Sequence, residues 1–395
     1  MTEWIECTLD KLGEIVGGAT PSTKCEDYYG GSIPWITPKD LSSFKGRYIT
    51  SGERNITEKG LASCSAQMMP KDAVLFTSRA PIGYVAIASQ SVCTNQGFKS
   101  IVVNEKADPL FVYYLLKYNK DAIEAMGSGT TFKEVSGKTM RAVKVRIPLD
   151  VSYQKRIAAV LDSLDTKIEN NERINDNLEQ QAMALYRQMF VETNNDARRE
   201  CRADEYFDIS IGKTPPRKEA QWFSMNPIDW IWVSISDMGR CGMYIADSSE
   251  YLTHESLDKF NIKVVPDNTV LLSFKLTVGR VAITDGAMAT NEAIAHFKTD
   301  KPEINEYLYC YLKDFNYQTM GSTSSIATAV NSKIIKAMPF VAPTDAELVT
   351  FHSATAPMFE MIKTRQRENT RLAELRDSLL PKLMSGEIDV SAVKL

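Results

Sequence analysis

The chain has 395 residues, of which 44% are hydrophobic and 24% are charged, and its formal net charge is -4. This composition is ordinary for a soluble globular protein with room for two or three domains. No run of about 18 apolar residues occurs, and the N-terminus is acidic where a signal peptide is basic, so we exclude a membrane protein and expect a cytoplasmic location.

The seven cysteines and three histidines are scattered along the chain. No C-x-x-C pair occurs, and His254, His296 and His352 stand far apart. Because metal sites and disulfide frameworks depend on clustered spacings, we predict free thiols and no bound metal.

Residues 1–150 alternate short strand-like runs with turn signals, such as AVLFTS and IGYVAIA. A helical run from Leu110 to Met126 follows, and then the polar loop GSGTT at Gly127 to Thr131. The strand-like run AVKVRIP ends at Pro148. We predict a first globular domain over residues 1–150.

A long helix is predicted next, because apolar residues recur every three and four positions from Ile157 to Phe190. Its heptad seam consists of Leu161, Leu164, Ile168, Asn171, Asn175, Leu178, Ala182, Leu185 and Met189. A seam this narrow needs a partner helix. The helix fades in the polar run ETNNDARRE, so residues 151–198 are predicted to be a helix and a linker.

The second half of the chain repeats the first. AVLFTSRAPIGYVAI is echoed by TVLLSFKLTVGRVAI, and Thr94-Asn95 returns as Thr290-Asn291 at an offset of 196. Several landmarks share a period near 194, which indicates a tandem duplication with a second globular domain over residues 199–345.

A matching helix is predicted over residues 346–395, opened by the capping box Thr344-x-x-Glu347. Its seam lies 194 positions beyond the first and consists of Thr355, Met358, Ile362, Arg365, Asn369, Leu372, Arg376, Leu379 and Leu383. Asn175 and Asn369 match, and a buried asparagine at such a position fixes the pairing register. Pro381 and Gly386 are predicted to end the helix.

We therefore predict an α+β fold. Two similar globular domains in a pseudo-twofold tandem repeat are joined by two long helices that form an antiparallel coiled coil. Parallel pairing, which would place both domains at one end, and two unrelated surface helices are the alternatives.

The helix length suggests a spacer. Thirty-four helical residues extend roughly 50 Å at ~1.5 Å each, and two major-groove sites on one face of DNA lie about 34 to 36 Å apart. Two different readers at a fixed separation would recognise two different half-sites across an unread gap.

The candidate DNA-binding residues are basic side chains and the polar loops that precede them. GSGTT and its counterpart GSTSS offer amides and hydroxyls that suit phosphate, although a solvated loop and a charged strand face are an equal interpretation. Trp35, Trp222, Trp230 and Trp232 are interpreted as core aromatics rather than stacking platforms. The candidates are Lys39, Arg79, Gly127, Ser128, Thr130, Thr131, Lys133, Lys138, Arg141, Lys275, Arg280, Ser322, Ser324, Lys333 and Lys336.

Catalytic motifs are missing from the sequence. No G-x-x-x-x-G-K-[ST] phosphate loop and no F-x-G-x-G motif for S-adenosylmethionine occurs, and Asn226-Pro227-Ile228-Asp229 has only the first half of an adenine-methyltransferase motif. No catalytic residues are predicted.

The order PWITPKDL, AVLFTSRAPIGYVAI, TNQGF, GSGTTFKEVSGKTMRAVKVRIP and IAAVLDSLDTKIENN, repeated in weaker form, resembles the specificity (HsdS) subunit of type I restriction-modification systems. The resemblance covers essentially the whole chain. The second copy departs from the first, because it lacks the Gln154 to Ile157 pattern before its helix.

The resemblance implies a non-catalytic, double-stranded-DNA-binding subunit. Residues 1–150 and 199–345 would be target-recognition domains that read the 5′ and 3′ parts of a bipartite site. Two modification (HsdM) subunits would methylate adenine with S-adenosylmethionine, and two restriction (HsdR) subunits would use ATP and Mg. This chain would bind no cofactor of its own.

Two other functions stay open on the sequence alone: a non-catalytic scaffold that binds two proteins, and a self-sufficient DNA methyltransferase. The sequence does not name the bases read, the length of the gap between half-sites, or the presence of a restriction subunit.

Overall fold

A computed structural model describes residues 2–129, 133–320 and 331–393. The chain forms two compact units, unit 1 with residues 1–169 and 370–395, and unit 2 with residues 170–369. This division passes through both long helices, whereas the predicted domains kept each helix in a segment of its own. Each unit thus contains one globular part and a portion of each helix.

Unit 1 is built around a five-stranded sheet in the order β2-β9-β6-β7-β4, with a three-stranded sheet β5-β3-β8 and a two-stranded ribbon β1-β10 beside it. The predicted helix from Leu110 to Met126 is in fact two helices. The strands are β1 (Trp4–Thr8), β2 (Gly13–Gly17), β3 (Tyr29–Ile36), β4 (Tyr48–Ile49), β5 (Arg54–Ile56), β6 (Val74–Ser78), β7 (Ile82–Ala88), β8 (Cys93–Thr94), β9 (Lys99–Val103) and β10 (Lys144–Pro148). The short helices are α1 (Pro38–Ser42), α2 (Glu58–Ala62), α3 (Pro109–Tyr118), α4 (Lys120–Ala125) and α5 (Gly137–Ala142).

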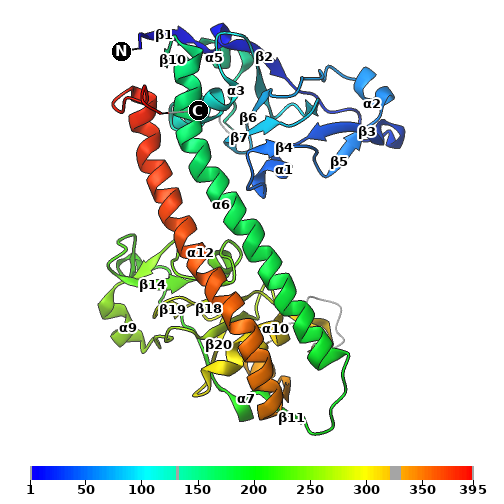
Figure 1. Ribbon diagram of the computed structural model, residues 1–395, viewed down its shortest axis with the longest axis vertical. Coiled ribbons are helices and arrows are strands. Elements are labelled where there is room, and N and C mark those ends of the chain that lie inside the picture. Colours follow the sequence, from blue (N-terminus) through cyan, green and yellow to red (C-terminus); the bar gives the residue numbers. More distant parts are fainter. Residues whose placement is uncertain (1, 130–132, 321–330, 394–395) are drawn as a thin grey trace. The chain divides into compact units, whose positions relative to one another are not determined.

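Unit 2 repeats this topology, with a five-stranded sheet β12-β20-β17-β18-β15, a four-stranded sheet β13-β16-β14-β19 and a ribbon β11-β21 (Figure 1). Its strands are β11 (Arg199–Arg202), β12 (Asp208–Ile211), β13 (Phe223–Ser224), β14 (Trp230–Val233), β15 (Tyr244–Ile245), β16 (Tyr251–Leu252), β17 (Val270–Ser273), β18 (Val281–Thr284), β19 (Ala289–Thr290), β20 (Ile294–Lys298) and β21 (Pro339–Ala342). The short helices are α7 (Ala203–Tyr206), α8 (Ile235–Met238), α9 (His254–Phe260), α10 (Asn305–Asp314) and α11 (Ser332–Lys336).

The predicted duplication is confirmed down to single backbone angles. Three pairs of residues 196 positions apart have a positive φ: Asp72 (68°) and Asn268 (55°), Ala80 (52°) and Leu276 (59°), Gly83 (99°) and Gly279 (93°). A positive φ is uncommon for residues other than glycine. Matched exceptions in both units therefore show that the backbone follows the same path through these turns in unit 1 and in unit 2.

The two long helices are α6 (Val151–Tyr186), which continues as one π-helical turn over Arg187–Val191, and α12 (Asp345–Ser385). The capping box of α12 is confirmed: the amide of Thr344 donates to Glu347 Oε2 at 3.0 Å, and the amide of Glu347 donates to Thr344 Oγ1 at 3.3 Å. The prediction that Pro381 ends the helix is wrong, because α12 runs four residues further to Ser385, before Gly386 with φ 80°. Pro381 is exposed, so water can hydrate the carbonyl that lacks its helical donor.

In unit 1 the helices run antiparallel, since Tyr153 contacts Asp389 and the later Asp165 contacts the earlier Arg376. The seam residues Leu161, Leu379 and Leu383 belong to one core cluster. Leu164, Ile168 and Leu372, which were predicted in the seam, are only half-buried, whereas Asp165 is 6% exposed. The buried face of α6 is shifted because the helix packs on α3 as well as on α12: the hydroxyl of Tyr114 donates to Asp165 Oδ2 at 2.8 Å.

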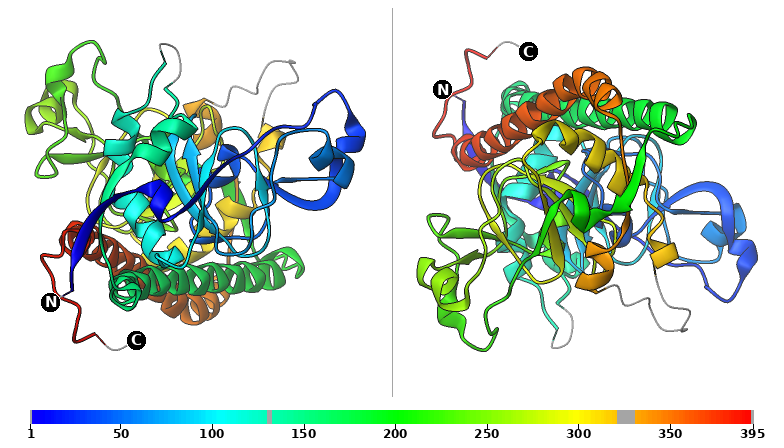
Figure 2. Two further views of the ribbon diagram at one scale, coloured as in Figure 1. Left: turned by 90° about the horizontal axis from the view of Figure 1, so that it is seen from above. Right: turned by 90° about the horizontal axis from the view of Figure 1, so that it is seen from below.

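In unit 2 the antiparallel pairing continues. Leu178 and Leu185 of α6 pack in one cluster with Met358 and Ile362 of α12. The asparagines of the seam do not pair as the repeat suggested, which matched Asn175 with Asn369. Asn369 Oδ1 accepts a hydrogen bond from Asn171 Nδ2 at 2.8 Å. The side-chain oxygen of Asn175 is buried without a hydrogen-bond partner. Figures 1 and 2 both show α6 and α12 side by side.

In both units, polar contacts join an edge strand of the main sheet to a long helix. In unit 1, Arg47 lies beside β4 and reaches three acidic residues of α6, Asp162 at 3.4 Å, Asp165 at 3.9 Å and Glu169 at 3.2 Å. In unit 2 the equivalent strand β15 is held by α12, because the amide of Gln366 donates to the Tyr244 carbonyl and accepts from its N–H, both at 3.0 Å. These polar contacts fix where each sheet meets its helix.

We predict that Arg376→Ala destabilises unit 1 by about 2 kcal/mol, because the mostly buried carboxylate of Asp165 loses its shortest ion pair and is left with Tyr114 and the more distant Arg47. Arg376 Nη1 lies 2.7 Å from Asp165 Oδ1. Urea unfolding followed by circular dichroism measures the change. Arg371→Ala, at an exposed position of the same helix, is the control and is expected to change stability by less than about 0.5 kcal/mol. Equal midpoints for the two variants would contradict the prediction.

His296 gives unit 2 a pH-dependent stability. It is fully buried between the hydroxyls of Ser210 (3.0 Å) and Thr290 (2.7 Å), and burial lowers its pKa from 6.5 to about 3, with smaller contributions from Lys298 and Lys263. The folded state therefore holds a neutral ring, and its contribution is complete above pH 6.5 and is lost as the pH falls toward 3.

The matched variant is His296→Gln, which keeps donor and acceptor groups but does not titrate. The free energy of unfolding of the wild type, relative to that of His296→Gln, should fall by about 1.4 kcal/mol per pH unit below 6.5. Denaturant unfolding of both proteins between pH 7 and pH 5 measures it. A constant difference over this range would show that His296 does not become protonated on unfolding.

Candidate nucleic-acid interface

The turn between the third and fourth strands of each main sheet carries a cation at the same place. Arg79 follows β6, and Lys275 stands 196 positions later, just after β17. The turn is closed in the same way in both units: the N–H of Tyr84 donates to Thr77 Oγ1 at 2.8 Å, and the N–H of Arg280 donates to Ser273 Oγ at 3.0 Å. Arg79 and Lys275 are thus structurally equivalent.

In unit 1 this turn joins a basic cluster around one carboxylate, Glu134. Arg79 Nη1 lies 3.4 Å and Lys99 Nζ 3.5 Å from the two oxygens of Glu134. Lys133 is the neighbour of Glu134 in the chain, and Lys138 is exposed on α5 close after it. We call Arg79, Lys99, Lys133, Glu134 and Lys138 the Glu134 cluster. It contains four cations and one anion, so it carries positive charge at neutral pH.

Arg141 follows Lys138 on α5, and its guanidinium contacts the backbone of β2. Its Nη2 is 3.5 Å from the carbonyl oxygen of Ile15, and a Cβ added to Gly137 would lie 3.5 Å from its Nη1. Sequence reasoning missed Lys99, because a single lysine on a strand carries no signal until the structure places it beside the loop.

The loop GSGTT uses its first two amides inside the protein. The N–H of Gly127 donates to the Glu124 carbonyl at 3.0 Å, and Ser128 forms a two-way backbone bridge with Glu134 at 3.0 and 2.9 Å. Neither amide is available for a phosphate. Thr130 and Thr131 lie outside the described residues.

In unit 2 the candidate cations are spread more widely. Lys275 is exposed, with Nζ 5.7 Å from the ring of Phe274. Arg280 serves the fold, since its Nη1 donates to the Ile235 carbonyl at 2.6 Å. Lys333 is exposed on α11, and Lys336 adds to the lowering of the pKa of Asp208, whose main cause is a hydrogen bond with Lys298. Ser322 and Ser324 lie outside the described residues.

Lys39 is not part of the Glu134 cluster and pairs with Glu53 instead. Its ammonium lies 2.7 Å from Glu53 Oε2, and both side chains are exposed. Trp35, Trp222 and Trp232 are buried, as expected for core aromatics, whereas Trp230 is half-buried and donates to His254 Nδ1 at 2.9 Å.

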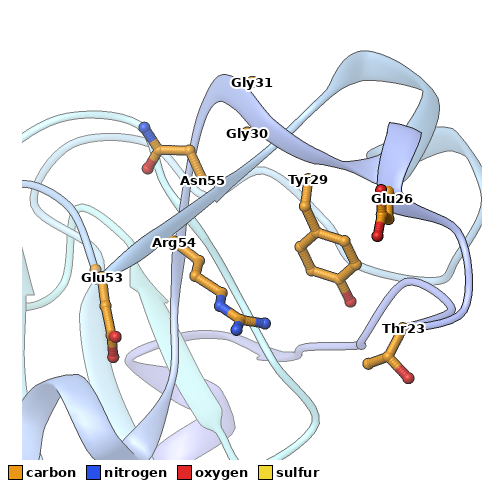
Figure 3. A pocket seen from close by; sticks show the side chains of 9 residues that line it. Thr23, Glu26, Tyr29, Gly30, Gly31, Glu53, Arg54 and Asn55 are labelled. Carbon is orange, nitrogen blue, oxygen red and sulfur yellow. The ribbon is translucent and has the colours of Figure 1, made fainter.

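A shallow hollow lies between β3 and β5 in unit 1. Figure 3 shows its lining, in which the ring of Tyr29 stands between the side chains of Arg54 and Glu26. In the described part of the chain, no three histidine, cysteine or acidic side chains come together as metal ligands. The expectation that this protein binds no metal stays a prediction.

No helix in the described ranges is long and apolar enough to span a bilayer. The family model for the type I restriction modification DNA specificity domain matches residues 1–180 and again residues 200–347. The chain belongs to this family. The two matches cover the two globular parts, in agreement with the duplication.

Named relatives agree with the family. The chain is 33% identical over 421 residues to the type I restriction enzyme MjaIX specificity subunit of Methanocaldococcus jannaschii, covering 98% of this chain and 94% of the relative. It is 23% identical to the HindI specificity subunit of Haemophilus influenzae, over 73% of this chain and 80% of that protein.

The crystal structure of a type I restriction-modification S subunit from M. genitalium has the same fold, with a TM-score of 0.57, 16% identity, and coverage of 97% of this chain and 96% of that one. The predicted fold class and family are therefore confirmed. Because the relatives are specificity subunits of type I restriction enzymes, the prediction that this chain is the specificity subunit and not a catalytic subunit is confirmed as well.

Proposed function

We propose that this chain selects the DNA sequence for a type I restriction-modification complex, with each globular part reading one half of an asymmetric bipartite site. The observation that carries the proposal is the pair of equivalent turns, which present Arg79 in one unit and Lys275 in the other on the same backbone. Equal scaffolds with different side chains suit two half-sites of different sequence.

Charge supports double-stranded DNA as the ligand. In the Glu134 cluster of unit 1, Arg79 and Lys99 pair with the carboxylate of Glu134, and the exposed Lys133 and Lys138 lie close to it in the chain. Lysine and arginine contacts to phosphate provide affinity and orientation, while other side chains read the base edges.

The paired helices support a spacing role. The 36 residues of α6 extend about 54 Å at about 1.5 Å each. Buried polar contacts, such as Asn171 with Asn369, oppose sliding of one helix along the other. We propose that this length sets the unread gap and that the helices bind two methyltransferase (HsdM) subunits, with two restriction (HsdR) subunits in the full complex.

On this proposal the chain holds no cofactor itself. S-adenosylmethionine would bind to the methyltransferase subunits, and ATP and Mg would bind to the restriction subunits. The complex would act in the cytoplasm.

The basic cluster provides the first test. The double variant Lys133→Gln, Lys138→Gln should weaken binding to duplex DNA of any sequence and should lower the slope of log K against log salt by about 2, because two phosphate contacts are lost. Gel-shift titrations at about 50 to 200 mM salt measure both effects, because salt weakens phosphate contacts over this range.

The matched control is Lys71→Gln, an exposed lysine at the other end of β6 from Arg79. It should leave affinity within about twofold, since a surface charge away from the interface is near neutral. If the double variant bound as tightly as the control at every salt concentration, Lys133 and Lys138 would not be phosphate contacts. If the wild type itself did not bind duplex DNA, the scaffold function without DNA would be favoured.

The spacing role has its own test. Residues 166–172 of α6 and 369–375 of α12 lie directly beyond the Asp165–Arg376 pair of unit 1, and they contain the Asn171–Asn369 pair of unit 2. Deleting both heptads shortens the helix pair by about 10 Å at about 1.5 Å per residue, which corresponds to about 3 base pairs at 3.4 Å each. Methylation mapping of genomic DNA should show both half-sites unchanged and a shorter gap. An unchanged gap would refute the spacing role.

A further inference from the structure

A second turn, which we call the Asn turn, has the same construction in both units. It consists of Thr94–Gly97 in unit 1 and Thr290–Ala293 in unit 2, and each begins at the last residue of a short strand. Its third residue is Gln96 in unit 1 and Glu292 in unit 2, and both are exposed. The sequence signal was the repeated Thr-Asn pair, which sequence reasoning used only as evidence of duplication.

The backbone of the Asn turn is fixed by matched hydrogen bonds. The N–H of Asn95 donates to the Ile36 carbonyl at 3.0 Å, and the N–H of Asn291 donates to the Val233 carbonyl at 2.9 Å. The asparagine side chain then closes the turn by accepting from the N–H of Gly97 at 2.8 Å, or of Ala293 at 3.1 Å. The turn cannot shift without breaking these bonds.

A second segment packs against the turn and repeats as Gly-x-Thr-Pro. A Cβ on Gly18 would lie 2.1 Å from the Asn95 carbonyl oxygen, and one on Gly212 would lie 2.2 Å from that of Asn291, so only glycine fits. Buried tryptophans hold the next residue: Trp35 Nε1 donates to Ala19 O at 3.0 Å, and Trp232 Nε1 donates to Lys213 O at 3.1 Å.

This segment restrains the exposed side chain. The hydroxyl of Thr20 donates to the side-chain oxygen of Gln96, and the hydroxyl of Thr214 donates to the carboxylate of Glu292. An exposed long side chain normally samples several rotamers, and ordering it costs free energy on binding. Here that cost is reduced before any ligand arrives.

The Asn turn lies next to the cation-bearing turn in both units. The N–H of Ser78 donates to the Gly97 carbonyl at 2.7 Å, and the N–H of Phe274 donates to the Ala293 carbonyl at 2.9 Å. Arg79 and Lys275 are the next residues along the chain. In each unit a phosphate-attracting cation therefore directly follows the residue that is hydrogen-bonded to the Asn turn.

We propose that Gln96 and Glu292 are base-reading residues, Gln96 selecting an adenine in one half-site and Glu292 a cytosine in the other. The amide of glutamine can accept from adenine N6 and donate to N7, whereas a carboxylate only accepts and suits the amino group of cytosine N4. The side-chain oxygen of Gln96 uses one of its two lone pairs for Thr20, and the carboxylate of Glu292 uses one of about four for Thr214, so acceptor sites remain for a base. This inference rests on the proposed function and assigns a part of it to named atoms.

The test uses two isosteric swaps, Gln96→Glu and Glu292→Gln, in the complex with the methyltransferase subunits. Bound sequences are selected from a random duplex oligonucleotide pool and sequenced. Each swap should change the ratio of selected bases about tenfold at one position of one half-site, because it alters the hydrogen bonds that discriminate adenine from cytosine there. The other half-site and the gap should stay as in the wild type.

The controls are Gln90→Glu and Glu205→Gln, which make the same changes at exposed positions outside the turns. They should leave every base preference within twofold. Thr20→Val and Thr214→Val, which release the restrained side chains, should weaken selectivity at the same positions as the swaps while the salt dependence of binding is unchanged. Thermal unfolding of each variant verifies that it is folded.

The outcomes separate the two proposals. A wild-type complex that selects no sequence would refute the proposed function itself. A wild type that selects a bipartite site while both swaps retain its base preferences within twofold would overturn this inference alone.

Discussion

The antiparallel pairing of α6 and α12 is the constraint on which the structure depends. Each helix has a narrow apolar seam that needs a partner helix to bury it. Each unit uses a portion of both helices to complete its core. In unit 1, Leu383 and Met384 of α12 are buried in the same cluster as β6, α3 and α6. In unit 2, Tyr186 of α6 packs between Tyr307 and Phe351. In each unit, the globular part and the two helix portions therefore share one hydrophobic core.

Sequence repetition predicted the architecture because duplication preserves backbone constraints. The offset of 196 that aligned the β6–β7 turn with the β17–β18 turn also relates Ala80 to Leu276, two non-glycine residues with positive φ. The same offset identified Arg79 and Lys275 as counterparts. Where a position is determined by the local chain, as in the Thr344–Glu347 capping box, the sequence is sufficient.

The positions that could not be predicted depend on packing between distant segments. A heptad pattern placed Leu164 and Ile168 in the seam, but α6 also packs on α3, and Asp165 takes the buried position with Tyr114 and Arg376 as partners. Arg280 was a candidate for DNA contact on its charge, but its guanidinium is bound to the Ile235 carbonyl. The partner of a long side chain depends on tertiary structure, which a one-dimensional pattern does not contain.

The division of both helices between the units has a consequence for cleavage of the chain. The linker after Val191 is exposed from Glu192 to Ala197 and suits a protease. A cut there would break only the covalent link between α6 and the globular part of unit 2. The first fragment would still supply Leu178 and Tyr186 to the core of unit 2, and the second would still supply Leu383 to the core of unit 1. The nicked protein should remain one particle, with two fragments that complement each other.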